Sequence, residues 1–185
     1  NYDKINNTGG SVKTSDEVSG NTLTIADAVL SKSAYGGYSG GTGNTTGNTL
    51  IVNSGTYNAD IFGGYSKEGD ASGNTVEING GTFAVSNATS NATDPNIYGG
   101  FAAGSGSTLN NIVKISGNPD LTIAKIYGGN KDDNYTGNRL EVWSKGLTAN
   151  NVGNFQQYHF YLPADTQNGD TMLTLTNTAG TDISG

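Results

Sequence analysis

Apolar and polar residues alternate in five short stretches of this chain, and each stretch opens with asparagine. The third and fifth positions of every stretch are apolar, whereas the residue between them varies. The stretches begin at Asn21, Asn48, Asn74, Asn111 and Asn138. Such alternation places apolar side chains on one face of a β-strand and leaves the other face to mixed residues. Each stretch therefore predicts a half-buried strand.

These strands recur at intervals of 27, 26, 37 and 27 residues. Repeats of roughly 20–50 residues are typical of solenoids, in which each unit buries its apolar face on its neighbours. The pattern predicts an all-β fold, a right-handed parallel β-helix (β-solenoid) of about 26–27 residues per coil. The long interval contains residues 86–95, a polar segment expected to project as a loop. A β-propeller blade would need a longer repeat, of about 40–45 residues.

Equivalent residues of successive coils lie about 4.8 Å apart in a parallel stack. The asparagines are therefore expected to form a column of stacked side-chain amides, as in cross-β ladders. The expected inward column is Ile25, Val52, Ile78, Ile115 and Val142. The expected outward column is Thr24, Ile51, Glu77, Lys114 and Glu141.

A second motif, an aromatic ring followed by two glycines, comes after each of the first four strands. Its rings are Tyr35, Phe62, Tyr98 and Tyr127. The glycine pair suits a tight corner with positive φ. Rings that face inward would form a core ladder, which is the arrangement we favour; rings that face outward could contact a glycan or another partner. The ring column is thus the candidate contact site.

The chain changes character after the last asparagine strand. Residues 154–163 are rich in aromatic side chains and lack the glycine pair, and residues 171–175 alternate once more. Solenoids need atypical terminal units, because an open last coil exposes core and strand edges. We therefore divide the chain into an N-terminal edge or partial coil (1–18), β-helix repeats (19–153) and a C-terminal capping module (154–185). Because it stops mid-pattern, we interpret it as a fragment or a processed subunit.

The composition excludes several kinds of site and partner. The 185 residues include no cysteine and one histidine, and the net charge is −7. Disulfides, thiolate metal sites and histidine-based zinc sites are therefore excluded, and the negative charge opposes nucleic acid. No apolar run approaches the ~20 residues that span a bilayer, so no transmembrane segment is expected in this chain. We expect no cofactor, with weak calcium binding left open at the turn carboxylates Glu68, Asp70, Asp132 and Asp133.

One stretch matches a catalytic motif. Residues 37–41 fit the G-x-S-x-G pattern around Ser39, for which His159 is the only available histidine base. The same Gly-Gly-Tyr-Ser sequence recurs at residues 63–66, so we expect Ser39 to belong to a structural turn. Polysaccharide lyases and hydrolases need clustered carboxylates, whereas the acidic residues here lie in Gly/Asn-rich turns. The chain is therefore expected not to be an enzyme.

Two parts of the chain resemble the passenger region of bacterial autotransporters, the type V secreted surface proteins. Residues 19–129, with Gly-Asn-Thr-apolar and Ile-Tyr-Gly-Gly, look like adhesin-like passenger repeats. Residues 154–163 and the following Asp-Thr-Met-Leu at 170–173 look like the module that ends such repeats. The resemblance implies export, location at the bacterial cell surface or outside the cell, and adhesion or aggregation. It also implies anchoring by a barrel outside this chain, and fits the absence of cysteine.

Three functions remain open. The first is a non-enzymatic surface or secreted solenoid that acts in adhesion, in aggregation or as a stalk. The second is a self-assembling extracellular filament subunit, and the third a polysaccharide-acting enzyme or glycan-binding module. The expected partners are a host or bacterial surface protein, a glycan or a second copy. An ice-binding solenoid would need an unbroken threonine column, and the one at Thr22, Thr49 and Thr75 breaks at Ile112 and Arg139.

Overall fold

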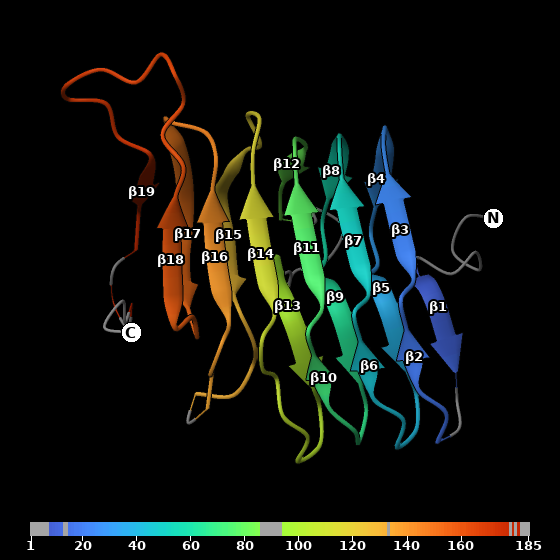
Figure 1. The fold of residues 1–185 in the computed structure, drawn as a ribbon. Helices are drawn as coiled ribbons and strands as arrows, with labels where there is room; N and C mark the ends of the chain where they lie inside the picture. The colour runs from blue at the N-terminus through green and yellow to red at the C-terminus, as the bar shows by residue number, and fades with distance from the viewer. Residues whose placement is uncertain are drawn as a thin grey trace.

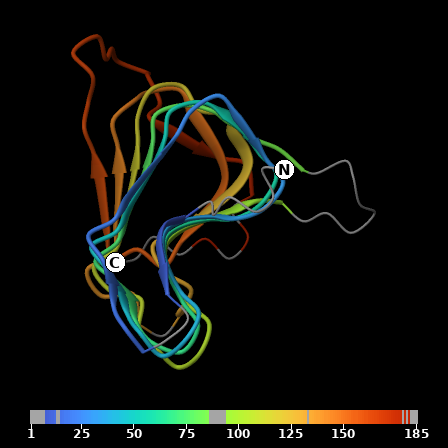
Figure 2. The same cartoon turned by 90° about the vertical axis from the view of Figure 1, so that its right-hand side faces the viewer.

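The computed structural model describes residues 8–12, 15–85, 94–132, 134–177, 179 and 181. Over these residues the chain forms β-strands and no helix, and the strands stack in parallel into a solenoid of about six turns. In Figure 1 the chain runs upward through the strands nearest the viewer and downward through the strands behind them. Successive turns advance from right to left. Figure 2, seen from the N-terminal end, shows the same winding. The predicted right-handed parallel β-helix is confirmed.

Two long sheets form the main walls. The six-stranded wall consists of β3 (Thr22–Ile25), β7 (Thr49–Val52), β11 (Thr75–Ile78), β14 (Ile112–Ile115), β16 (Arg139–Val142) and β18 (Gln157–Phe160). The seven-stranded wall consists of β1 (Thr8–Val12), β5 (Ala34–Ser39), β9 (Ile61–Ser66), β13 (Asn96–Ala102), β15 (Leu121–Tyr127), β17 (Leu147–Gly153) and β19 (Leu173–Leu175). Each of the five predicted asparagine strands lies in the six-stranded wall, directly after its asparagine.

Two short sheets close the corners. One consists of β2 (Val18–Ser19), β6 (Thr45–Thr46) and β10 (Ala71–Ser72). The other consists of β4 (Ala28–Leu30), β8 (Gly55–Tyr57) and β12 (Thr82–Phe83). Most of the predicted loop at residues 86–95 lies outside the described residues.

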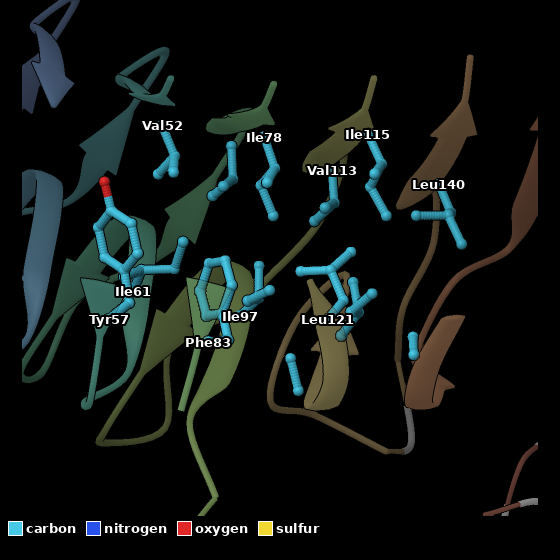
Figure 3. Close-up of a cluster of buried hydrophobic side chains, with 14 of the residues drawn as sticks. Val52, Tyr57, Ile61, Ile78, Phe83, Ile97, Val113, Ile115, Leu121 and Leu140 are labelled. Atoms are coloured by element: carbon cyan, nitrogen blue, oxygen red, sulfur yellow. The ribbon is translucent and has the colours of Figure 1, made fainter. Parts of the chain in front are cut away.

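The predicted inward column fills the core. Val52, Ile78, Ile115 and Val142 are completely buried, and Ile25, in the first strand of the wall, is nearly so. Figure 3 shows several of these side chains pointing from the six-stranded wall toward those of the opposite wall. On the outer face, Lys114 lies between Glu77 and Glu141 in register, and its Nζ is 3.6 Å from the Glu77 carboxylate. Opposite charges therefore alternate over these three positions of the outward column, as cross-strand pairing favours.

The last turn is shorter than the others. Arg139 is in register with Gln157, so only 18 residues separate equivalent positions there, against 27 between Thr22 and Thr49. As after β13 and β15, the chain passes from β17 to β18 without a strand in the corner sheet of β2, β6 and β10, but here only residues 154–156 separate the two wall strands. After β18, residues 161–172 leave the stack as an excursion that Figure 1 shows above the wall, before β19 returns to it.

Candidate functional site

The four predicted rings lie on the outer face of the seven-stranded wall. The residues just before them, Ala34, Ile61, Ile97 and Ile126, belong to the buried core. Since successive side chains of a strand point to opposite faces, the rings point outward. The favoured inward orientation is wrong, because the alanine and isoleucines occupy the inner side of these strands.

The first three glycine pairs lie inside strands and are not corners. Gly36 and Gly37 lie within β5, and neither they nor Gly63 and Gly64 in β9 have positive φ. A side chain on Gly36 would overlap backbone of β9 and β7, and one on Gly37 would lie 2.5 Å from the Asn48 side chain. Both glycines of a pair therefore face the interior. The predicted tight corner is wrong; the pair instead lets the strand approach the asparagine column.

Two consecutive inward-facing glycines bring the next aromatic residue back to the outer face. A second ladder of Tyr38, Tyr65 and Phe101 therefore runs beside the first. Its rings stack with centroids 5.2 and 5.4 Å apart, while those of the first ladder are 5.0 to 5.4 Å apart. Rings of the two ladders meet edge to face, as Tyr35 and Tyr38 do at 5.1 Å. Sequence reasoning missed this ladder, although the aromatic residue after each of the first three glycine pairs was its signal.

Stacking leaves little open ring face on the first ladder. Phe62 lies between Tyr35 and Tyr98, which are nearly parallel to it at 5.0 and 5.4 Å. At the C-terminal end, Tyr127 is in register with Gly153, whose Cβ position lies 3.1 Å from the ring. A sugar that stacks on an aromatic residue needs its face. The ladder therefore offers a ligand ring edges and hydroxyl groups.

Those hydroxyl groups keep their protons at neutral pH. Burial raises the pKa of Tyr98, and the nearby carboxylates of Asp60 and Asp132 raise it further. Burial also raises the pKa of Tyr35 and of Tyr127. The outer surface of this ladder thus combines neutral phenols with carboxylates.

The asparagine column is an interior hydrogen-bonded ladder. Each of the first four asparagines donates its backbone N–H and its side-chain Nδ2 to the Oδ1 of the next. For Asn48 and Asn74 both distances are 3.0 Å. The same pattern joins Asn21 to Asn48, Asn74 to Asn111 and Asn111 to Asn138. All but Asn21 are fully buried. The predicted stacking of amides is confirmed.

The G-x-S-x-G match does not assemble a catalytic group. Ser39 is fully buried in β5, and its counterpart Ser66 donates its hydroxyl to the carbonyl of Gly43 at 2.7 Å. His159 lies on β18, at the other end of the stack (Figure 1). The structure does not bring Ser39 and His159 together.

The acidic turn residues are dispersed among protein partners. Asp70 accepts a hydrogen bond from the Ser107 N–H at 2.7 Å, and Asp132 accepts one from Asn154 at 3.0 Å. Glu68 lies 3.7 Å from Lys67. Asp133 lies outside the described residues. Within the described part of the chain, no three His, Asp or Glu side chains are grouped as metal ligands.

A further aromatic cluster holds the excursion after β18. The Trp143 ring stacks on Tyr161 with centroids 3.7 Å apart, and its Nε1 donates to Glu141 at 3.2 Å. Lys145 contacts the carboxylates of Asp165 and Asp170 at 3.2 and 2.9 Å. Sequence reasoning missed the ring stack and the ion pairs because they join residues 18 to 25 positions apart outside the repeat.

No family model matches the chain, and no curated protein or solved structure matches it either. The resemblance to autotransporter passengers therefore depends on the residues quoted for it and on the solenoid fold. In the described ranges, no helix has the length and apolar character that a membrane span requires.

Proposed function

We propose that this chain is a non-enzymatic β-solenoid of the bacterial cell surface or extracellular space, of the kind found in autotransporter passengers, where it acts as a stalk or adhesin-like spacer. The observation that carries the proposal is the buried asparagine ladder. It uses the recurring polar side chain of the repeat to join each coil to the next.

The contacts support a rigid rod. Neighbouring coils are joined by parallel backbone pairing, by the amide ladder inside and by stacked rings outside. Amides buried without these partners would cost about 1–3 kcal/mol for each unsatisfied group, so bending that separates two coils is strongly opposed. A rod of this kind suits a protein that holds a binding surface away from a cell.

Display on a bacterium tests this proposal. The chain is placed between a signal peptide and the membrane barrel of a known autotransporter, with that autotransporter's own passenger as the positive control. We expect surface labelling of intact cells, and a folded core that resists added protease. Retention inside the cell, or rapid degradation of the displayed chain, would contradict the proposal.

A second candidate, glycan binding, is favoured by the outward position of the ring ladder beside Asp60 and Asp132. Hydroxyl groups and carboxylates are the polar groups that would fix a sugar at ring edges. The matched variant is Tyr98→Phe, which removes one hydroxyl and keeps the stack. On a glycan array, binding by the parent chain that falls in Tyr98→Phe would support this candidate; equal binding by both, or none, would contradict it.

A further inference from the structure

The second aromatic ladder contains a pair of tyrosines from neighbouring coils. Tyr38 of β5 and Tyr65 of β9 are in register, on strands that Figure 1 shows side by side. Their rings stack with centroids 5.2 Å apart and with 11° between the ring planes. Equivalent residues of adjacent parallel strands lie about 4.8 Å apart, so the whole side chains run alongside each other. Two phenol rings therefore lie face to face, with too little space between them for another side chain.

The neighbours of this pair along the ladder are not phenols. On one side Phe101 is in register with Tyr65 and stacks on it at 5.4 Å. On the other side Tyr38 is in register with Ser11. Phenylalanine and serine have no phenol hydroxyl. Tyr38 and Tyr65 thus form an isolated pair within their own ladder.

A third phenol, Tyr35 of the first ladder, lies nearby in a different orientation. Its ring centroid is 5.1 Å from that of Tyr38 and 5.6 Å from that of Tyr65, at interplanar angles of 67° and 78°. Such contacts set the edge of one ring against the face of the other. In the stacked pair, by contrast, the ring carbons beside one hydroxyl lie next to the same carbons of the partner. The stacked pair has the better geometry for a bond between those carbons.

Stacked phenols of this kind are substrates for oxidative coupling. A one-electron oxidant takes one electron and one proton from each phenol, and each resulting radical is shared with the ring carbons beside its oxygen. A carbon–carbon bond then forms between two of these carbons, and the hydrogen on each returns to the phenol oxygen as the ring becomes aromatic again. With a haem peroxidase, each link consumes one hydrogen peroxide, which the two electrons and two protons reduce to two molecules of water.

We infer that Tyr38 and Tyr65 form an oxidative cross-linking site, at which a peroxide-driven one-electron oxidant joins two neighbouring coils through their phenol rings. Both side chains are half-buried on the outer face of the wall, so their ring edges are accessible. Well-oriented groups within one molecule react at effective molarities of about 10⁵ M or more, which favours coupling within the chain over coupling between chains.

The link would act as a covalent staple in a protein that contains no cysteine. It closes a loop of 27 positions between Tyr38 and Tyr65. A cross-link across such a loop stabilises a fold mainly by restricting the unfolded chain. The inference extends the proposed rod, but it rests only on the stacked pair and not on where the rod is displayed.

Oxidation of the purified chain tests the inference. The parent chain is treated with a haem peroxidase and one equivalent of hydrogen peroxide. We expect dityrosine fluorescence to appear and the mass of the monomeric chain to fall by two hydrogen atoms. Cleavage before Asp60 places Tyr38 and Tyr65 on different peptides, so mass spectrometry should find these two peptides joined. The yield per chain should not depend on the chain concentration.

Two matched variants assign the link. Tyr65→Phe removes one phenol hydroxyl and keeps a ring in the stack, so the joined peptides should disappear. Tyr35→Phe removes the neighbouring phenol instead, and the yield of joined peptides should stay unchanged. Circular dichroism establishes that both variants are folded. In thermal unfolding, the linked parent should have a midpoint about 5–10 °C above that of the unlinked parent.

Four outcomes would overturn the inference. They are an oxidised parent without the joined peptides, a Tyr35→Phe chain that loses them, a link found only between chains, and a linked chain that unfolds at the same temperature as the unlinked one. Surface display does not depend on any of these readouts, so their failure would leave the stalk proposal standing.

Discussion

The central coils and the C-terminal segment have the same strand register but different burial. Val142 in β16 and Phe160 in β18 occupy neighbouring places in one column, yet the smaller side chain is fully buried and the larger is half exposed. Both strands alternate in the same way. The difference is that β16 has a strand on each side, whereas β18 has one. Burial in this fold therefore comes from the next coil, not from the strand's own sequence.

The polar contacts of the two regions differ too. In the central coils, buried amides join each coil to the next. At the end of the ladder, the Asn138 Nδ2 donates instead to the backbone carbonyl of Asn154 at 3.1 Å. Beyond that point the excursion is held by surface contacts, the Trp143–Tyr161 stack and the ion pairs of Lys145. We expect substitutions in the central coils to affect the whole molecule and those in the C-terminal segment to act locally.

A large effect is expected inside the ladder. Asn74→Ala removes the acceptor of the Asn48 N–H and Nδ2 and the donor to the Thr45 carbonyl. Because these groups are buried, the free energy of unfolding should fall by about 2–4 kcal/mol. The matched control is Asn21→Ala, at the half-buried start of the ladder, which should cost less than about 1 kcal/mol. Urea unfolding measures the free energy of unfolding of both variants. Equal losses would contradict the expectation that the buried part of the ladder contributes more than its half-buried start.

Gly64, which faces the asparagine ladder, gives a second test of how tightly the central coils are packed. An alanine at Gly64 would overlap the side-chain amide of Asn74. We expect Gly64→Ala to lower the free energy of unfolding by about 1–3 kcal/mol through overpacking. In the double variant Gly64→Ala with Asn74→Ala the overlap disappears, so the loss should be smaller than the sum of the single losses. Additive losses would show that the glycine does not serve to accommodate the amide.

Truncations at Ile115 and Phe160, two positions of the same core column, compare the centre of the stack with its end. Ile115→Ala in a central coil should cost about 2–5 kcal/mol, the range for buried aliphatic truncations. Phe160→Ala removes more atoms but should cost less than about 1.5 kcal/mol, because half of the ring is already in water. Thermal or urea unfolding of the monomer at low concentration is the measurement. A Phe160→Ala loss as large as that of Ile115→Ala would mean that the end of the stack is packed like its centre.

The smallest effect concerns the excursion. The hydrogen bond from Lys145 and then the Gln167 N–H lower the pKa of Asp170 below its ordinary value of 3.8. The stabilisation that this carboxylate provides is therefore present above that ordinary value and is lost as the pH falls through the lowered one. In Lys145→Met, NMR titration should show the pKa of Asp170 rising part of the way back, because Gln167 remains. Hydrogen exchange should increase at residues 161–171 and stay unchanged in β11. Unchanged exchange at residues 161–171 would contradict the expectation that Lys145 holds this segment to the stack.

Particular residues show where sequence reasoning succeeded. The asparagine strands were predictable because alternation and period are local properties, and a parallel stack then places Asn48 against Asn74 without further information. The orientation of Tyr35 was not predictable in this way. Two glycines in succession face inward, which interrupts the alternation, and only the proximity of Asn48 on the opposite wall explains why they do.

The amino-acid sequence by itself determined the repeat, the parallel stacking and the column that fills the core, because a period of strands with one apolar face can be buried only by neighbouring coils. Tertiary structure alone decided which side the rings occupy, why the glycines are there and how the last turn ends. Those features depend on contacts between opposite walls and between residues about 20 positions apart, and no local pattern along the chain encodes such contacts.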